Sequence, residues 1–399
     1  MFASGINKTV TVDSEASWGV PNAAGSVTAK YIPRVTLDLS LTRESFASER
    51  INSTAQVTEA RSGTDSVSGT LSDECASGSH TAFYEALLRG TFATGVTNTA
   101  TVIAANATGN KLVRSSGSWI TLGFKIGDVV DVTSTANNGR AMIMSLTATE
   151  MVLNGFTIVS AAEGTSVTVA VAGKKLLIPA DPASRLDKSF TFEQFYSDIS
   201  VSRVASGCKI GSASVSIQPD AMATVEFAVM GKDMKTASSK YFTAPAAATA
   251  SSVMAGNKAF LMIDGAPAVL VSALDFEING NLEASSVVGN LQSDGTRPAA
   301  NIFLGKIEVS GTLTAYFESD ALFTKFRDDT DITLAFWMKG DNGKMLAYKM
   351  GRVRLGSATP NDSATGGLTQ ELSFTALYRE SASGTAYDDS AIVIQEVTA

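Results

Sequence analysis

The chain has one histidine and two cysteines among its 399 residues, so it has little of what proteins use for catalysis and metal binding. General bases and transition-metal ligands are most often histidine, and His80 is the single imidazole. Cys75 and Cys208 form no CxxC pair, which argues against a zinc site or a disulfide framework and fits a reducing compartment. We expect two buried cysteines, and a His80 that caps a helix or lies on the surface.

Catalytic motifs are also missing. No GxSxG, HExxH or GxxxxGK[ST] segment occurs, so the sequence predicts no nucleophile elbow, zinc-protease helix or phosphate loop. The acidic run at 327–331 lacks the alternating ligands and the glycine of a calcium loop. We therefore predict no enzyme activity, no metal and no cofactor.

Basic patches and long apolar segments are scarce as well. The net charge of −8 argues against a surface that grips a phosphate backbone. The uncharged run at 243–257 is rich in Ala, Ser and Thr and predicts a linker, not a membrane span. The N-terminus shows no basic start before an apolar core, so we expect no secretory signal and no membrane partner.

Alternating apolar and polar residues dominate the chain. In 35–42 every odd position is apolar and every even position is polar, which is the period of a strand with one buried face. The same pattern recurs at 66–72, 212–217, 224–229, 273–279, 306–313 and 370–374. Because parallel strands are usually buried on both faces, these half-polar strands predict a mainly β fold of antiparallel sheets. Two short helices are predicted near 79–89 and 319–328.

The pentapeptide VSGTL occurs at 67–71 and again 242 positions later, at 309–313. LDLSLTR, which begins at Leu37, precedes the first copy, and LDFEING, which begins 237 positions later at Leu274, precedes the second. Each copy is followed by a helix, an aromatic-rich strand and two further strands; CKIGSASVSI at 208–217 corresponds to YKMGRVRLGS at 348–357. Ordered features at a nearly constant offset indicate an internal duplication. The valine and leucine of VSGTL should face the core.

The two copies differ by an insertion in the first. We predict a first β-sandwich or partial-barrel unit at 1–98 plus 186–235, a small inserted β-barrel domain at 99–185, a linker with an entry strand at 236–268, a second unit at 269–380 and a C-terminal arm at 381–399. Each unit is flanked by one of the short helices. Because insertions of this size occur at surface loops, the inserted domain should project from the main sheet.

Two long connections and the C-terminus are candidates for subunit contacts. Residues 44–65 and 280–305 are too long for tight hairpins, and they occupy the same place in the two units. Their candidate contact residues are Glu44, Arg50, Asn52, Arg61, Asn290, Asp294 and Arg297. The C-terminal strand carries Ile392, Ile394 and Val397; it either closes its own sheet or adds to the edge of a neighbour.

These segments together resemble the major tail tube proteins of long, flexible-tailed bacteriophages. The resemblance rests on LTRESFASERINSTAQVTEARSGTDSVSGTL, FYEALLRGTF, SFTFEQF, CKIGSASVSI and FAVMGKDM, and in the second half on VSGTLTAYFESDALFTKF and ELSFTALY. It covers about 30–235 and 270–380. It implies a virion protein, assembled in the host cytoplasm, whose rings stack into a tube around a DNA channel.

The resemblance also implies partners. They are further copies of the chain, in a ring of three with pseudo-sixfold symmetry or in a ring of six, and tail proteins such as the tape measure, tail tip and terminator. Double-stranded DNA would pass without specific binding. The lumen candidates are Asp38, Asp275, Glu277 and Glu308, unless these are ordinary solubility residues. A head-tail connector or decoration protein and a secreted adhesin module are the alternatives.

Overall fold

The computed structural model describes residues 2, 4–51, 53–249, 251–268, 271–292, 295–317, 320–361, 367–380 and 385–398. The fold is mainly β, and every ladder between its strands is antiparallel, so the predicted fold class is confirmed. Two short α-helices accompany the strands in the described part of the chain. Among the described residues there are also four single-turn 3-10 helices: η1 (Gly5–Asn7) precedes β1, and η2 (Pro182–Ser184), η3 (Gly256–Lys258) and η4 (Asp341–Gly343) connect strands.

The first unit has two layers that share one long strand. Its elements are β1 (Lys8–Ser14), β2 (Lys30–Tyr31), β3 (Thr36–Leu37), β4 (Ser40–Ala47), β5 (Ala60–Glu74), α1 (Thr81–Leu88), β15 (Phe190–Tyr196), β16 (Val201–Ile217), β17 (Thr224–Gly231) and β18 (Asp233–Ala237). The inner layer runs β3/β4–β5–β17–β16, and the outer layer runs β2–β1–β15–β16–β18. The apolar core lies between the two layers.

The second unit repeats this plan. Its elements are β19 (Ala259–Ile263), β20 (Ala266–Pro267), β21 (Val271–Asn279), β22 (Glu283–Ser285), β23 (Asn301–Phe303), β24 (Glu308–Tyr316), α2 (Ala321–Arg327), β25 (Ile332–Lys339), β26 (Met345–Leu355), β27 (Thr359–Asn361), β28 (Thr369–Ala376) and β29 (Val393–Val397). The inner layer runs β21–β24–β28–β26/β27, and the outer layer runs β20–β19–β25–β26–β29.

Strand registers show which residues of the two units correspond. Phe190 pairs with Cys208 in the first unit, and Ile332 pairs with Val353 in the second. Both ladders then shift by one residue at the same place, before Phe192 and before Leu334. The counterpart of Cys208 is therefore Val353. The sequence match of CKIG to YKMG, which equated Cys208 with Tyr348, was wrong because cross-strand pairing, not similar letters, sets the register.

The two VSGTL segments occupy the same position and bury the same side chains. Val67 and Leu71 are buried, as are Val309 and Leu313, while the serines are exposed, as predicted. The glycine in each VSGTL segment is required for the same reason in both units. A Cβ on Gly69 would lie 2.4 Å from the Asp38 carbonyl oxygen, and one on Gly311 would lie 2.3 Å from that of Asp275. Each glycine allows the neighbouring strand to approach.

One continuous inner sheet joins the units. The last inner strand of the first unit, β16, pairs with the first strand of the second, β21, from Ser212 opposite Asn279 to Ile217 opposite Leu274. Buried contacts reinforce this seam, because the Tyr84 hydroxyl of α1 lies 2.7 Å from the Tyr348 hydroxyl of β26. The predicted single strand at 35–42 is instead two short strands, β3 and β4, interrupted at Asp38 and Leu39.

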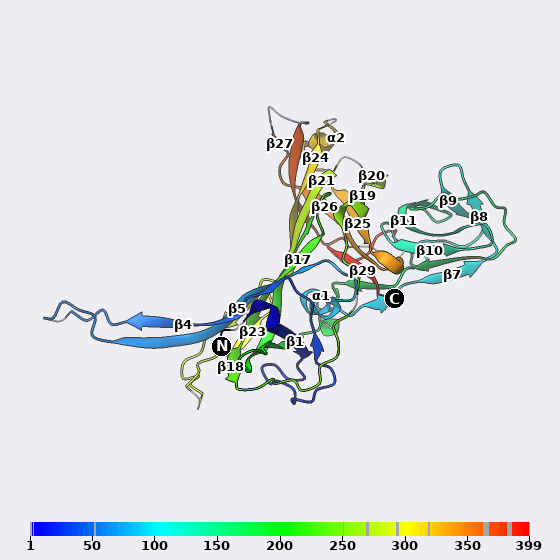
Figure 1. Ribbon diagram of the computed structural model, residues 1–399. Helices are drawn as coiled ribbons and strands as arrows, with labels where there is room; N and C mark the ends of the chain where they lie inside the picture. The colour runs from blue at the N-terminus through cyan, green and yellow to red at the C-terminus, as the bar shows by residue number, and fades with distance from the viewer. Residues whose placement is uncertain are drawn as a thin grey trace.

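The insertion forms a separate seven-stranded sheet. Its strands are β7 (Thr97–Ala100), β8 (Ile103–Asn106), β9 (Lys111–Arg114), β10 (Val129–Thr133), β11 (Asn138–Leu146), β12 (Glu150–Asn154) and β13 (Val167–Val171), in the order β7-β13-β10-β11-β12-β9-β8. Within the described residues β7 and β8 do not pair with each other, so the predicted barrel is an open sheet. Figure 1 shows it on one side of the body, opposite the long β4–β5 hairpin.

The inserted sheet packs against the second unit, although it interrupts the sequence of the first. Its core is continuous with Ala335 and Trp337 of β25 and with Met345 and Ala347 of β26. Two flanking strands, β6 (Ala93–Thr94) and β14 (Lys174–Leu177), belong to the large sheet, where β14 pairs with β29. The predicted boundary at 185 is therefore too late for the inserted sheet, which ends at Val171.

A buried ionic cluster lies where insertion and body meet. Lys175 of β14 and Lys349 of β26 both donate to Asp128 of the insertion, and both also pair with Asp388. Burial alone would lower the pKa of Lys349, but the adjoining Asp128 and Asp388 carboxylates outweigh it and hold this pKa above its ordinary value. Gln395 of β29 adds hydrogen bonds to the Val129 and Ala172 carbonyls. The insertion is fixed on the second unit by polar as well as apolar contacts.

Candidate functional site

The solvent-facing side of the continuous inner sheet carries mainly hydroxyl, amide, carboxylate and small or apolar side chains. Two cross-strand rows span both units and consist of Ser72–Glu226–Ser214–Glu277–Ser310–Thr375 and Glu74–Thr224–Ser216–Asp275–Thr312–Ser373. The opposite side of the same strands is buried, because the alternation of each strand sends every second residue into the core. We call this solvent-facing side the acidic face.

Several carboxylates of the acidic face are fixed by neighbouring hydroxyls. Asp38 Oδ1 accepts hydrogen bonds from the Thr70 backbone N–H at 2.7 Å and from the Thr70 hydroxyl at 3.1 Å. Glu226 Oε2 accepts one from the Ser72 hydroxyl at 3.0 Å. A hollow of about 620 Å³ lies over the centre of this face, and Glu226, Asp275 and Glu277 line it. The side chains of the hollow therefore present negative charge.

Between β5 and β28 the two rows hold no Lys or Arg. The first row ends at Arg354 of β26, which pairs with Thr375 and forms ion pairs with Asp329 and Asp331. Basic residues appear only at the margins, where Lys306 Nζ lies 3.4 Å from Glu308 Oε1 and both side chains are largely exposed. Exposed pairs of this kind contribute little energy and screen only their immediate surroundings. The centre of the sheet is thus a negatively charged surface without fixed counter-charges.

The structure brings the four lumen candidates together on this face. Asp275 and Glu277 lie in β21, Glu308 lies opposite Asn279 at the start of β24, and Asp38 is bonded to Thr70 of β5. Sequence analysis missed three further carboxylates, Glu74, Glu226 and Glu371. Part of the pattern that could have revealed them is in the sequence, because Glu226 lies between Val225 and Phe227, and Glu371 lies between Gln370 and Leu372. The order of the strands in the sheet, which the sequence does not show, decides that these carboxylates share a face.

The two long connections are placed differently in the two units. Glu44 and Arg61 lie on the β4–β5 hairpin and Arg50 beyond the end of β4, all three exposed. The connection of the second unit packs onto the first, where the Arg297 backbone N–H donates to Asp65 Oδ2 at 2.7 Å and the Asn290 side chain bonds to the Pro298 carbonyl. Asn52 and Asp294 lie outside the described residues.

The C-terminal strand closes the sheet of its own chain. β29 is inserted between β14 and β26, and Ile392, Ile394 and Val397 are buried there. Of the two interpretations left open by the sequence, pairing within the chain is the one that the structure contains. The first residues of the predicted arm, 381–384, lie outside the described part.

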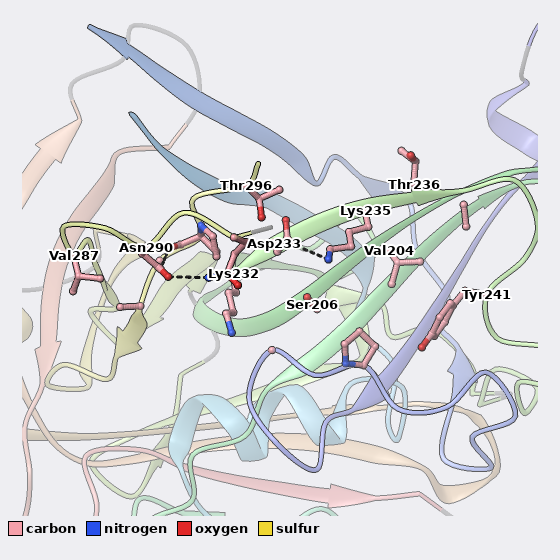
Figure 2. Close-up of a pocket in the computed structure, with 17 residues that line it drawn as sticks. Val204, Ser206, Lys232, Asp233, Lys235, Thr236, Tyr241, Val287, Asn290 and Thr296 are labelled. Carbon is pink, nitrogen blue, oxygen red and sulfur yellow. Dashed lines mark hydrogen bonds and ion pairs between the residues drawn. The ribbon is translucent and has the colours of Figure 1, made fainter. Parts of the chain in front are cut away.

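A cavity of about 650 Å³ lies at the seam between the units. Figure 2 shows Val287, Asn290 and Thr296 of the second unit's connection on one side and Val204, Thr236 and Tyr241 of the first unit on the other. Lys232, at the turn before β18, lies 4.5 Å from the Trp18 ring centroid. Among the described residues, the lining of this cavity includes one carboxylate, that of Asp233, and neither histidine nor cysteine. We interpret it as a gap between packed units.

His80 occupies the N-cap position of α1, as expected, but its side chain is buried and does not cap the helix. It precedes α1 without a side-chain capping bond and is 3% exposed. Burial lowers its pKa to about 3, while burial raises the pKa of Asp73, whose Oδ2 lies 3.3 Å from His80 Nε2, to about 6. An imidazole that stays neutral and enclosed has no access to a substrate.

Metal and membrane sites were searched within the described residues. There, no three His, Cys, Asp or Glu side chains are grouped as a metal site would require. None of the helices in this described part combines the length and the apolar character of a membrane span.

Comparison with known protein families identifies the family of the chain. A family model described as phage tail tube protein matches residues 5–376, which is nearly the whole chain. A search of curated proteins found no match. The matched segment contains the first unit, the insertion, the acidic face and the second unit as far as β28. The chain therefore belongs to the phage tail tube protein family and is a structural protein of a bacteriophage tail.

Proposed function

We propose that the chain forms stacked rings whose acidic faces line the channel through which DNA leaves the virion. The observation that carries the proposal is the acidic face itself, a continuous sheet across both units with carboxylates in its cross-strand rows and no basic side chain in those rows between β5 and β28. A tube needs one extended face turned to its axis, and this sheet is the longest one the chain offers. The inserted sheet, docked on the outer layer of the second unit, would lie outside the tube.

Charge explains how such a channel passes DNA without holding it. Two like charges 4 Å apart repel by about 1 kcal/mol in a water-like dielectric, and salt screens this beyond about 10 Å. Each copy would contribute Asp38, Glu226, Asp275, Glu277 and Glu308 to the wall. A phosphate backbone near the wall would be repelled from every side, so it would remain near the axis.

Ring size follows from the duplication. A chain with two similar units supplies two ring positions, so a ring of three chains has six units and pseudo-sixfold symmetry. We favour three chains over six because the in-chain joint between β16 and β21 already provides one of the two joints that each unit needs. The other tail proteins named above, as neighbours at the ends of the tube, belong to the same proposal, as does assembly in the host cytoplasm.

Negative-stain microscopy of the purified chain and of virions tests the assembly. We expect uniform hollow tubes of stacked rings, and projection averages should show three repeats with sixfold pseudo-symmetry. Averages with six complete chains around the ring would overturn the trimer. Monodisperse particles under all conditions, with no rings in virions, would overturn the tube itself.

A charge-reversal pair tests the acidic face. Asp275→Lys with Glu277→Lys should leave tubes intact, since both side chains lie on the solvent-facing side, but should slow DNA release from virions that carry the variant. The matched control is Glu150→Lys with Glu163→Lys on the inserted sheet, which makes the same change in net charge away from the channel. Equal release rates for the two variants would place the acidic face elsewhere than the lumen.

A further inference from the structure

The continuous inner sheet has two edges without a partner in the described chain. At one edge β3 and β4 pair with β5 alone, and at the other β27 pairs with β28 alone. Midway between them, the β16–β21 ladder joins the first unit to the second. An exposed strand edge presents unpaired N–H and C=O groups that other strands can bind. The chain thus contains one completed joint between units and the two halves of another.

Ladder registers identify which residues at the free edges correspond to those of the completed joint. Ser68 and Ser310 are the serines of the two VSGTL segments. Ser40 pairs with Ser68 and Glu277 pairs with Ser310, so Ser40 is the counterpart of Glu277. By the same register Asp38 is the counterpart of Asp275.

The other side of the joint has counterparts as well. Phe227 and Leu372 both pair with the leucine of a VSGTL segment, which makes Glu226 the counterpart of Glu371. Ser214 pairs with Glu226, and Thr359 pairs with Glu371. Thr359 is therefore the counterpart of Ser214, and Asn361 is the counterpart of Ser216.

We propose that a second copy of this chain adds its β3–β4 edge to the β27 edge of the first, in the register of the in-chain joint. Ser214 lies opposite Glu277 within the chain, so Thr359 of one copy lies opposite Ser40 of the next, and Asn361 lies opposite Asp38. This inference rests on the proposed ring assembly and supplies its residue contacts. A head-to-tail contact of this kind closes into a ring when its rotation divides a full turn.

Burial at the two joints supports the assignment. Ile278 of β21, which lies opposite Ala213 in the in-chain joint, is 0% exposed, whereas its counterpart at the free edge, Leu41, is 39% exposed. A neighbour seated on the β3–β4 edge would cover this leucine as the first unit covers Ile278. Covering such a side chain fully contributes about 1.5–3 kcal/mol before the costs of association.

A backbone hydrogen bond next to the in-chain joint has its counterpart groups at the two free edges. The Gly280 N–H donates to the Gly211 carbonyl at 2.8 Å next to the in-chain joint. The counterparts of these residues are Arg43 at one free edge and Gly356 at the other, so the register predicts the same bond between copies. Pro360, the counterpart of Val215, has no N–H, and the ladder between copies has no donor at that position.

The joint between copies also continues the acidic face. Within one copy Thr359 lies opposite Glu371, and within the next Ser40 lies opposite Ser68, so a row of the solvent-facing side would cross the joint at these residues. Asn361 and Asp38 would lie in the neighbouring row. None of the four side chains Thr359, Asn361, Ser40 and Asp38 is basic, so their pairing adds no positive charge to the acidic face.

Cross-linking tests the register. Thr359→Cys with Ser40→Cys in one chain should become joined between copies when assembled protein is treated with an oxidant or with a short reagent that carries two thiol-reactive groups. Denaturing gels should then show dimers and closed trimers. Cys75 and Cys208 are fully buried, so they should not compete. Ser214→Cys with Glu277→Cys is the in-chain control, and it should cross-link without any increase in mass. Thr359→Cys with Arg61→Cys is the off-register control, because Arg61 lies on the β4–β5 hairpin away from the joint.

The outcomes separate this inference from the proposed function. Tubes in the microscope together with cross-linking no stronger than in the off-register control would overturn the register and leave the tube standing. Dimers and trimers from the designed pair without any ring or tube would support the joint and overturn the tube. Closed hexamers would support the joint and replace the ring of three by one of six.

Discussion

The hydroxyl groups of Tyr84 and Tyr348 lie 2.7 Å apart and join the helix of the first unit to the outer layer of the second. Both side chains are buried, and burial raises both pKa values well above the ordinary value, so the pair remains protonated. Tyr84→Phe should lower the free energy of unfolding by about 1–3 kcal/mol, because it leaves the Tyr348 hydroxyl buried without this partner. Urea denaturation of the single variants and of the double variant measures the effect.

The double variant is the control for that prediction. Replacing both tyrosines by phenylalanine removes both polar atoms, so it should cost less than the two single changes added together. Additive losses would mean that the two hydroxyls do not depend on each other.

The buried cluster of Asp128, Lys175, Lys349 and Asp388 should hold the insertion on the second unit. Asp128→Asn removes the carboxylate that both lysines contact, and breaking a buried pair in this way typically costs about 3–5 kcal/mol. We expect lower thermal stability and faster protease cleavage near residues 95–96 and 172–173. Asp131→Asn is the matched control, because its partner Arg140 is partly exposed and the pair contributes roughly 0–1 kcal/mol. Equal losses in the two variants would contradict the role of the cluster.

Acid should destabilise the protein through His80. The folded-state pKa of about 3 lies below the unfolded value of roughly 6.5, so the stability that depends on neutral His80 is complete above pH 6.5 and is lost as the pH falls through about 3. The full loss is roughly 5 kcal/mol. Denaturation from pH 7.5 to 4 should therefore show a smaller decline for His80→Phe than for the parent chain.

Asp73 should act in the opposite direction. Its folded-state pKa of about 6 exceeds the unfolded value of roughly 3.9, so its stabilising contribution is complete below pH 3.9 and is lost as the pH rises through about 6. Solvent near the carboxyl reduces this contribution to the order of 1 kcal/mol. Asp73→Asn should accordingly lose more stability than the parent on acidification over the same range. Parallel pH profiles for the parent and both variants would contradict the two assignments.

The glycines of the VSGTL segments should be equally intolerant of a side chain. Gly69→Ala and Gly311→Ala would each place a Cβ against a carbonyl oxygen of the adjacent strand, and overpacking of this kind costs about 1–3 kcal/mol. Gly25→Ala is the control, because a Cβ there meets nothing within 4 Å. Thermal melts of the three variants make the comparison. A loss at only one of the VSGTL positions would indicate that the two units tolerate strain differently.

Much of the architecture was predictable from residue order. Alternation along the chain determined that the strands are half-buried, because a strand sends successive side chains to opposite sides. Repetition of VSGTL at a near-constant offset determined that one unit is used twice, and its valine and leucine are buried in both copies. The chemistry of the acidic face was also visible in part, since Asp38, Asp275 and Glu277 alternate with core residues.

Tertiary structure alone decided the rest, because it depends on contacts between residues far apart in the sequence. Nothing in the sequence places the insertion on the second unit, where Asp128 forms an ion pair with Lys349. Pairing across strands, with a bulge in each copy, made Val353 rather than Tyr348 the counterpart of Cys208. The β16–β21 ladder brought Ser214 beside Glu277 and so turned two separate patterns into one acidic face. Alternation fixes which side of a strand is wet, whereas register and strand order fix what lies beside it.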